Sequence, residues 1–220
     1  TAGALSANSI NATNVEATGN ITADNVTAGT VKAEHVDANV KAGSLELNSV
    51  VEVDGSKNWD VGTLKTGGNL TVSDASNLTV GSIVSAGDLK ISDTKNALRA
   101  TNITSGGALT IANGENVAPD ANITAKSGLT VSAGNLTAGN LSVNGALEAK
   151  TITADSVAFG SGATITNKDT TIKADAVTID TTSAMNKDNI GNLKIEPKTD
   201  GGNVNVKVVT KDGALTEDLE

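Results

Sequence analysis

Aliphatic residues recur along this chain at a spacing of about 19–20 residues, and this spacing limits the possible folds more than any other feature. The first of two such rows contains Val26, Leu45, Leu64, Ile83, Ile103 and Ile123. The second row contains Val31, Val51, Leu70, Leu89, Leu109 and Leu129. A constant spacing places equivalent side chains at the same depth in each repeat. We therefore expect stacked coils of one shape, with these residues as the structural core stack.

A shorter pattern occupies residues 1–45, where an aliphatic residue is followed two positions later by alanine. The aliphatic members are Ile10, Val15, Ile21, Val26, Val31, Val36 and Val40. Spacing by two places both side chains on one face of a strand. Because successive units begin about five positions apart, we expect four units to form one coil of about 20 residues.

From about Leu45 to Val143 the repeats contain longer segments in which apolar and polar residues alternate, often introduced by glycine. Glycine before a strand permits a tight corner. Helices are disfavoured, because Val, Ile, Thr, Asn and Gly are weak helix formers. The sequence predicts an all-β parallel β-solenoid with about 19–20 residues per coil.

The repeat pattern weakens after about residue 180. Residues 180–190 are polar, Pro197 follows, and residues 203–208 alternate as a single strand. We therefore predict a solenoid repeat domain over residues 1–182. Residues 183–220 are expected to form a C-terminal cap or a linker into a following module, because an open end of stacked strands promotes aggregation.

Composition narrows the classes of function. Trp59 and Phe159 are the only aromatic residues, there is no cysteine, and the net charge is −9 with Arg99 as the only arginine. Nucleic-acid binding through a basic face is disfavoured, since it requires clustered Lys and Arg. No apolar stretch is long enough to span a membrane. A disordered chain could share this composition, but it would have no reason to keep the spacing.

Residues that could perform catalysis are sparse. The only histidine, His35, precedes an inward-facing valine, so we expect it to point toward solvent. Carbohydrate-active β-helix enzymes remain the alternative of another class, but such enzymes need paired carboxylates, and here the acidic residues are scattered at turns. We predict no enzyme activity, no catalytic residue and no cofactor.

Acidic residues at turn positions are the candidates for metal binding. Calcium-binding β-rolls use a Gly-Gly-x-Gly-x-Asp repeat, which is lacking here. The aspartates at positions 54, 74, 88 and 93 are interpreted as turn formers, so no metal ligand is predicted.

Asn-x-Thr/Ser triplets occur nine times. They begin at Asn11, Asn20, Asn25, Asn69, Asn77, Asn102, Asn122, Asn135 and Asn140. Such triplets are glycosylation acceptors in eukaryotic secreted proteins. Their recurrence in step with the aliphatic rows favours a structural role, with asparagine at a corner and the next residue pointing inward.

Two runs on the long period, residues 67–72 (GGNLTV) and 106–111 (GGALTI), resemble the repeats of filamentous-haemagglutinin-type exoproteins and autotransporter passengers of bacteria. The resemblance covers roughly residues 10–180. It implies a right-handed parallel β-helix that is secreted or displayed on the bacterial cell surface as an adhesin stalk or fibre. Its implied partners are a host-cell or matrix receptor, or further copies of the chain, with no nucleic acid and no membrane insertion by this segment.

A second resemblance is to pentapeptide-repeat proteins, some of which mimic DNA through an acidic surface. Their alanine usually lies two residues before the central aliphatic or aromatic residue, whereas here alanine follows it. A DNA mimic is therefore a further, weaker alternative. We predict a structural or interaction protein.

Overall fold

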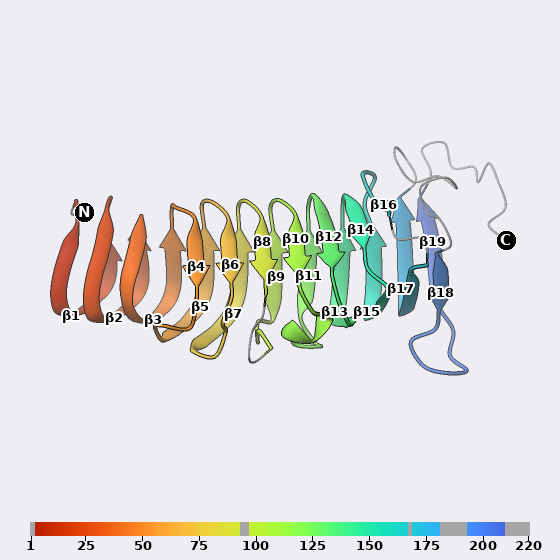
Figure 1. The fold of residues 1–220 in the computed structure, drawn as a ribbon, viewed down its shortest axis with the longest axis horizontal. Coiled ribbons are helices and arrows are strands. Elements are labelled where there is room, and N and C mark those ends of the chain that lie inside the picture. Colours follow the sequence, from red (N-terminus) through yellow and green to blue (C-terminus); the bar gives the residue numbers. More distant parts are fainter. Residues whose placement is uncertain (1–2, 93–96, 167–168, 181–192, 210–220) are drawn as a thin grey trace.

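In the computed structural model, which describes residues 3–92, 97–166, 169–180 and 193–209, the chain forms an elongated rod (Figure 1). The rod is a parallel β-solenoid of about nine turns, and 65% of the residues lie in strands. No α-helix occurs in the described residues, and the one short helix is the 3-10 turn η1 (Gly114–Asn116). The predicted all-β parallel solenoid is confirmed.

Two parallel sheets run along the rod. The twelve-stranded sheet contains, in spatial order, β1 (Leu5–Glu16), β2 (Asn20–Ala33), β3 (His35–Leu47), β5 (Trp59–Thr66), β7 (Leu78–Ser85), β9 (Asn102–Ser105), β11 (Asn122–Ala125), β13 (Asn135–Val143), β15 (Thr151–Phe159), β17 (Thr171–Asp180) and β18 (Lys194–Glu196), with β19 (Asn205–Val209) also paired to β17. The seven-stranded sheet contains β16 (Thr164–Ile165), β14 (Ala146–Glu148), β12 (Gly128–Val131), β10 (Leu109–Ile111), β8 (Leu89–Ile91), β6 (Leu70–Val72) and β4 (Val51–Val53).

Each coil has three sides, as the middle of the rod illustrates. Residues 59–61 form the first side, residues 64–66 the second and Leu70–Val72 the third. On each side the first and third residues are buried. Two consecutive residues that are not buried, Gly62 and Thr63, interrupt the alternation inside β5, which turns the chain from the first side to the second. The resulting core is a narrow prism of aliphatic layers.

The first coils are shorter than the sequence predicts. Leu5 pairs with Ile21 and Val26 pairs with Val40, so one turn takes 16 and then 14 residues. Three aliphatic-x-alanine units, rather than the predicted four, therefore complete a coil here, because each unit supplies one side of a three-sided prism. Most later coils take 18, 19 or 20 residues because a loop, such as residues 73–77, is added at one corner, while the coil from β13 to β15 again takes 16.

The shorter first coils change the membership of the two predicted rows. Val26 pairs with Val40, and Val31 pairs with Leu45. Val26 therefore does not continue the first row, and Val31 belongs to the first row instead of the second. The prediction is wrong at these two positions, because the step of the later coils cannot be extended back into shorter ones.

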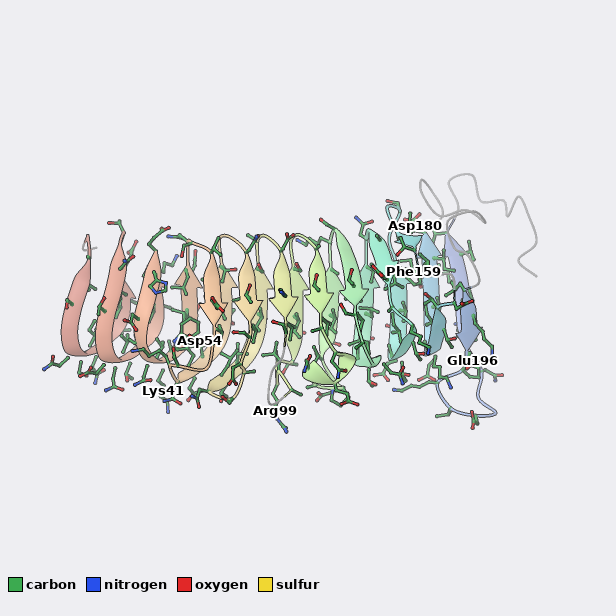
Figure 2. All side chains as sticks on the ribbon, viewed as in Figure 1. Lys41, Asp54, Arg99, Phe159, Asp180 and Glu196 are labelled. Carbon is green, nitrogen blue, oxygen red and sulfur yellow. The ribbon has the colours of Figure 1, made fainter. Side chains whose placement is uncertain are left out.

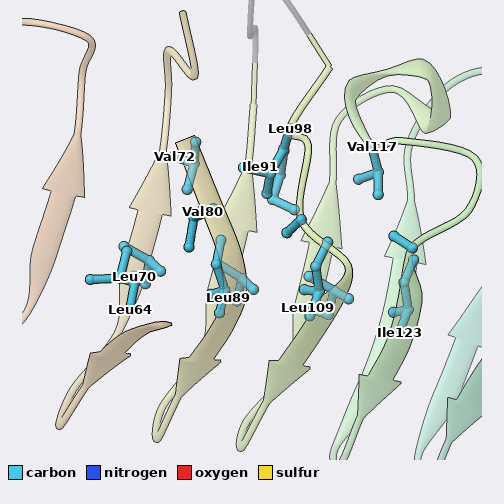
Figure 3. Packing of buried hydrophobic residues seen from close by; sticks show 14 of the residues in the cluster. Leu64, Leu70, Val72, Val80, Leu89, Ile91, Leu98, Leu109, Val117 and Ile123 are labelled. Atoms are coloured by element: carbon cyan, nitrogen blue, oxygen red, sulfur yellow. The ribbon is translucent and has the colours of Figure 1, made fainter. Parts of the chain in front are cut away.

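From Leu45 onward, the strand register places the remaining residues of each row above one another. The first row pairs Leu45, Leu64, Ile83, Ile103 and Ile123 in turn. The second row pairs Val51, Leu70, Leu89, Leu109 and Leu129 in turn. Figure 3 shows Leu70, Leu89 and Leu109 from successive coils in the interior. All these residues are buried, so the rows form the core of the rod.

The corner between the first and second sides contains a ladder of glycines. A Cβ atom on Gly62 would lie 2.6 Å from the carbonyl oxygen of Gly43, and a Cβ on Gly81 would lie 2.8 Å from that of Gly62. Gly43 itself has the same relation to Gly29, at 2.9 Å. The coils approach so closely here that a side chain would force the backbone apart.

Asparagines from the Asn-x-Thr/Ser triplets stack at the same corner farther along the rod. The Asn140 Nδ2 donates to Asn122 Oδ1 at 2.8 Å, and the Asn122 Nδ2 donates to Asn102 Oδ1 at 3.2 Å. Ser156 Oγ continues the series by donating to Asn140 Oδ1 at 2.7 Å. These contacts support the structural interpretation of the triplets, because each amide bridges neighbouring coils.

Hydroxyl groups replace aliphatic ones at one inward position. Thr66, Ser85 and Ser105 are buried in successive coils. Ser85 Oγ donates to the carbonyl of Gly68 at 3.1 Å, and Ser105 Oγ donates to that of Ala108 at 2.9 Å. They satisfy carbonyl groups at the corner that leads into the third side, which explains polar residues inside an aliphatic core.

At the C-terminal end, β18 and β19 both pair with β17 and extend the large sheet. The strand predicted over residues 203–208 corresponds to β19. Lys173 contacts Glu196 at 3.4 Å, and Lys198 forms an ion pair with Asp155, so charged contacts also connect this segment to the coils before it. The predicted division after residue 182 lies outside the described residues.

Candidate functional site: a groove beside strand β4

The stack of strands is interrupted where the short coils give way to long ones. Strand β4 ends the seven-stranded sheet, with β6 as its neighbour. Residues 35–38 at the start of β3 occupy the same side of the preceding coil, but no ladder pairs them with β4 among the described residues. The two coils therefore separate on this side of the rod.

A hollow of about 430 Å³ lies at this separation. Its walls are His35, Val36 and Asp37 on one side, and Val50 with residues 52–57 on the other, while Trp59 also lines it. We refer to this hollow, defined by these residues, as the β4 groove. Figure 2 labels Asp54, which lies in the loop at the end of the groove.

Trp59 lies beside this interruption of the ladder. Its side chain is buried, and its indole Nε1 donates to the carbonyl oxygen of Ala38 at 3.2 Å. In a regular parallel ladder, a carbonyl at this edge would accept from a backbone N–H of the next coil. For the Ala38 carbonyl, the indole N–H is the donor instead.

Acidic groups dominate the electrostatics of the groove. Lys57 Nζ lies 2.9 Å from Asp37 Oδ1, so these two charges compensate each other. Glu52 Oε1 accepts a long hydrogen bond, 3.4 Å, from Ser73 Oγ. With Lys57 already paired, Glu52 and Asp54 leave the groove with an excess of negative charge.

The carboxylate of Asp54 is held in its charged form by a local turn. Its Oδ1 accepts from the backbone N–H of Ser56 at 2.9 Å. Hydrogen bonds from the Ser56 side chain and backbone lower the pKa of Asp54 from its usual value, and slight burial opposes them. Asp54 therefore stays anionic to a lower pH than a free aspartate.

The structure places His35 on an exposed part of the chain, as expected, at the rim of the groove. Asp54 and Asp74 hold local turns, as interpreted, because each accepts from the backbone N–H two residues on, whereas Asp88 connects its coil to the next one. Asp74 Oδ1 accepts from the N–H of Ser76 at 2.8 Å, and Asp88 Oδ1 accepts from that of Ala108 at 2.8 Å. Asp93 lies outside the described residues.

Within the described ranges, no three His, Cys, Asp or Glu side chains gather as ligands for a metal ion. A search of the same residues for a helix long and apolar enough to cross a membrane finds none. The predictions that the chain lacks catalytic, cofactor-binding and metal-binding residues stay predictions.

Sequence reasoning alone does not find the groove. Two signals were available: the only tryptophan and the only histidine lie little more than one coil apart in the chain, and the repeat length changes between them. Neither signal places the residues on facing walls without knowledge of how many sides a coil has.

Comparisons of the chain with protein-family models, curated proteins and solved structures find no match. The fold itself supports the coarser description: this is a β-helix repeat protein.

Proposed function

We propose that this chain is a rod segment of a bacterial secreted or cell-surface protein of the adhesin, fibre or surface-layer type. The observation that carries the proposal is the continuity of its core. One row of buried aliphatic residues follows the second side of the prism from Val15 in β1 to Val177 in β17, and every strand pair along it is parallel. A core that continues through every coil in this way is suited to spanning distance.

Rod length follows directly from the number of coils. Strands in a sheet lie about 4.8 Å apart, so nine coils span about 43 Å. Each coil buries its apolar side chains against its two neighbours, and therefore length can be added without a change of cross-section. This property supports a role in spacing other modules from an anchoring point.

One edge of the rod is suited to display. The loops formed by residues 54–58 and 73–77, and the segment that contains η1, follow one another along the same long edge (Figure 1). Loops on a rigid scaffold commonly carry recognition. A host-cell or matrix receptor, or another copy of the chain, is the kind of partner proposed here, at an extracellular location.

Duplication of two coils tests the spacer role. A variant that repeats residues 70–108 contains two additional coils in register, because Leu70 pairs with Leu89 and Leu89 pairs with Leu109. Small-angle scattering should show a maximum dimension longer by about 10 Å. An unchanged length, or loss of the β signal in circular dichroism, would contradict a modular rod.

The proposed location needs a separate experiment. An antibody raised against residues 45–143 should label intact bacterial cells that produce the protein, or should detect the protein in their medium. Labelling only after the cells are permeabilised would refute a surface or secreted role.

A further inference from the structure

Among the described residues, β6 is the only strand that pairs with β4, so the opposite backbone edge of β4 has no strand partner there. The Val51 N–H donates to the carbonyl of Asn69, and the carbonyl of Val53 accepts from the Ser73 N–H, both at 2.9 Å. Successive residues of a parallel strand bond to opposite neighbours. The N–H and C=O of Glu52, which lies between the two valines, therefore face away from β6 and into the β4 groove.

Apolar surface accompanies this edge. Val50, directly before β4, is 69% exposed, which is the highest value among the large hydrophobic residues that the structure describes as exposed. Val36, Val53 and Trp59 also line the groove, beneath the polar rim. A free strand edge beside exposed apolar surface is a template for an added strand.

The charge of the groove restricts which strand can be added. Asp37 and Lys57 compensate each other, while Glu52 and Asp54 are acidic and project from the rim. An acidic segment would be repelled there, whereas a segment with lysine or arginine at its outward positions would find opposite charges.

We propose that the β4 groove binds an extended peptide segment in which basic and aliphatic residues alternate, by addition to the free edge of β4. The aliphatic side chains of the segment face Val53 and Trp59, on the inward face of the groove, and its basic side chains face Glu52 and Asp54 on the outward face. Main-chain hydrogen bonds to Glu52 supply the attachment, as in other cases of strand addition. The hollow of about 430 Å³ falls within the range of roughly 300–1,000 Å³ typical of ligand pockets. This inference does not depend on the proposed spacer role.

Trp59 provides a direct readout, because it is the only tryptophan and lines the groove. The probe is the blocked pentapeptide acetyl-Val-Lys-Val-Lys-Val-amide, titrated against the full chain at low salt. We expect a saturable change in tryptophan fluorescence. The acidic counterpart, acetyl-Val-Glu-Val-Glu-Val-amide, should produce no saturable change.

Two charge-reversal variants form a matched pair. Glu52 and Glu148 occupy the same outward row, because the register links position 52 through 71, 90, 110 and 130 to position 148. Both substitutions change the net charge equally, but only Glu52 lines the groove. Glu52→Lys should weaken peptide binding by about five- to tenfold, while Glu148→Lys should change it by less than about twofold.

A third variant tests the backbone contact. Glu52→Pro removes the N–H that faces the groove and leaves the bonds that Val51 and Val53 make toward β6. Proline is tolerated on edge strands. This variant should lose saturable binding while its circular dichroism spectrum stays that of the unmodified chain, and if it does not fold, the charge-reversal pair decides.

Several results would overturn the proposal. The first is the lack of any saturable fluorescence change at millimolar peptide. Others are equal loss of affinity in Glu52→Lys and Glu148→Lys, which would indicate bulk charge alone, and equal binding of the acidic peptide. Saturable binding of a neutral oligosaccharide such as cellotriose, in place of the peptide, would assign the groove to a different class of ligand.

Discussion

Truncation of Leu89 tests the proposition that stacked aliphatic layers stabilise the rod. Leu89 lies in β8 between Leu70 and Leu109 and is 1% exposed. Leu89→Ala deletes three carbon atoms, and the lost transfer free energy is about 2.4 kcal/mol at about 0.8 kcal/mol per methylene. A cavity adds to this cost when the surroundings cannot collapse, and measured Leu→Ala substitutions in cores cost about 2–5 kcal/mol.

The rod leaves little room for such a collapse, because the backbone ladders of β6, β8 and β10 fix the spacing of the layers. We therefore expect the free energy of unfolding to fall by about 3–4 kcal/mol. Urea unfolding followed by circular dichroism measures this value. Tryptophan fluorescence, recorded in parallel, reports on the coil that contains Trp59.

The matched control is Lys90→Ala. Lys90 occupies the adjacent position of the same strand but points outward and is exposed. Its removal should change the free energy of unfolding by no more than about 0.5 kcal/mol. A cost below about 1 kcal/mol for Leu89→Ala, or an equal cost for both variants, would refute the argument that depth in the layer determines stability.

Three further predictions concern Gly62 at the corner between the first and second sides, Trp59 beside the β4 groove, and Asp54 in the loop that follows β4. Gly62→Ala should destabilise the rod by about 1–3 kcal/mol, because its Cβ would lie 2.6 Å from backbone, while Gly3→Ala, which has open space, should have little effect in the same urea titration. Trp59→Phe should cost about 1–3 kcal/mol, because a carbonyl loses its indole donor; an unchanged urea midpoint would show that this hydrogen bond contributes nothing. Asp54 has a lowered pKa in the folded chain, so its stabilising effect is present above its ordinary pKa of 3.8 and is lost as the pH falls through the lower folded value. The melting temperature of Asp54→Asn should therefore lie below that of the unmodified chain near pH 6 and converge with it in strong acid; a constant difference would contradict the assignment.

The sequence was sufficient to predict the stack but not its cross-section. The rows from Leu45 and from Val51 onward could be read from spacing alone, because identical depth in each coil requires identical spacing. The number of sides in a coil could not be predicted from the spacing. A five-residue unit fits a three-sided or a four-sided coil equally well until the corner geometry is known. The errors at Val26 and Val31 follow from this ambiguity.

The groove could not be predicted for a related reason. In the sequence, Trp59 stands out only as a rare aromatic residue. Its importance arises from an interaction between two coils, since its indole meets Ala38, 21 positions earlier in the chain. Periodicity describes what successive coils share, and an interruption between two coils is by definition not shared.

The three corners of the prism differ in whether they have room for a side chain or an inserted loop. The corner that contains Gly62 packs backbone against backbone, and the corner at Gly67 does likewise, with a hypothetical Cβ only 2.9 Å from the Asn48 carbonyl oxygen. The third corner carries the loops of variable length, such as residues 73–77. Inserted residues should therefore be tolerated in the loops of the third corner without disturbing the aliphatic layers. The exposed residues along this one edge of the rod can then change while the core stays the same.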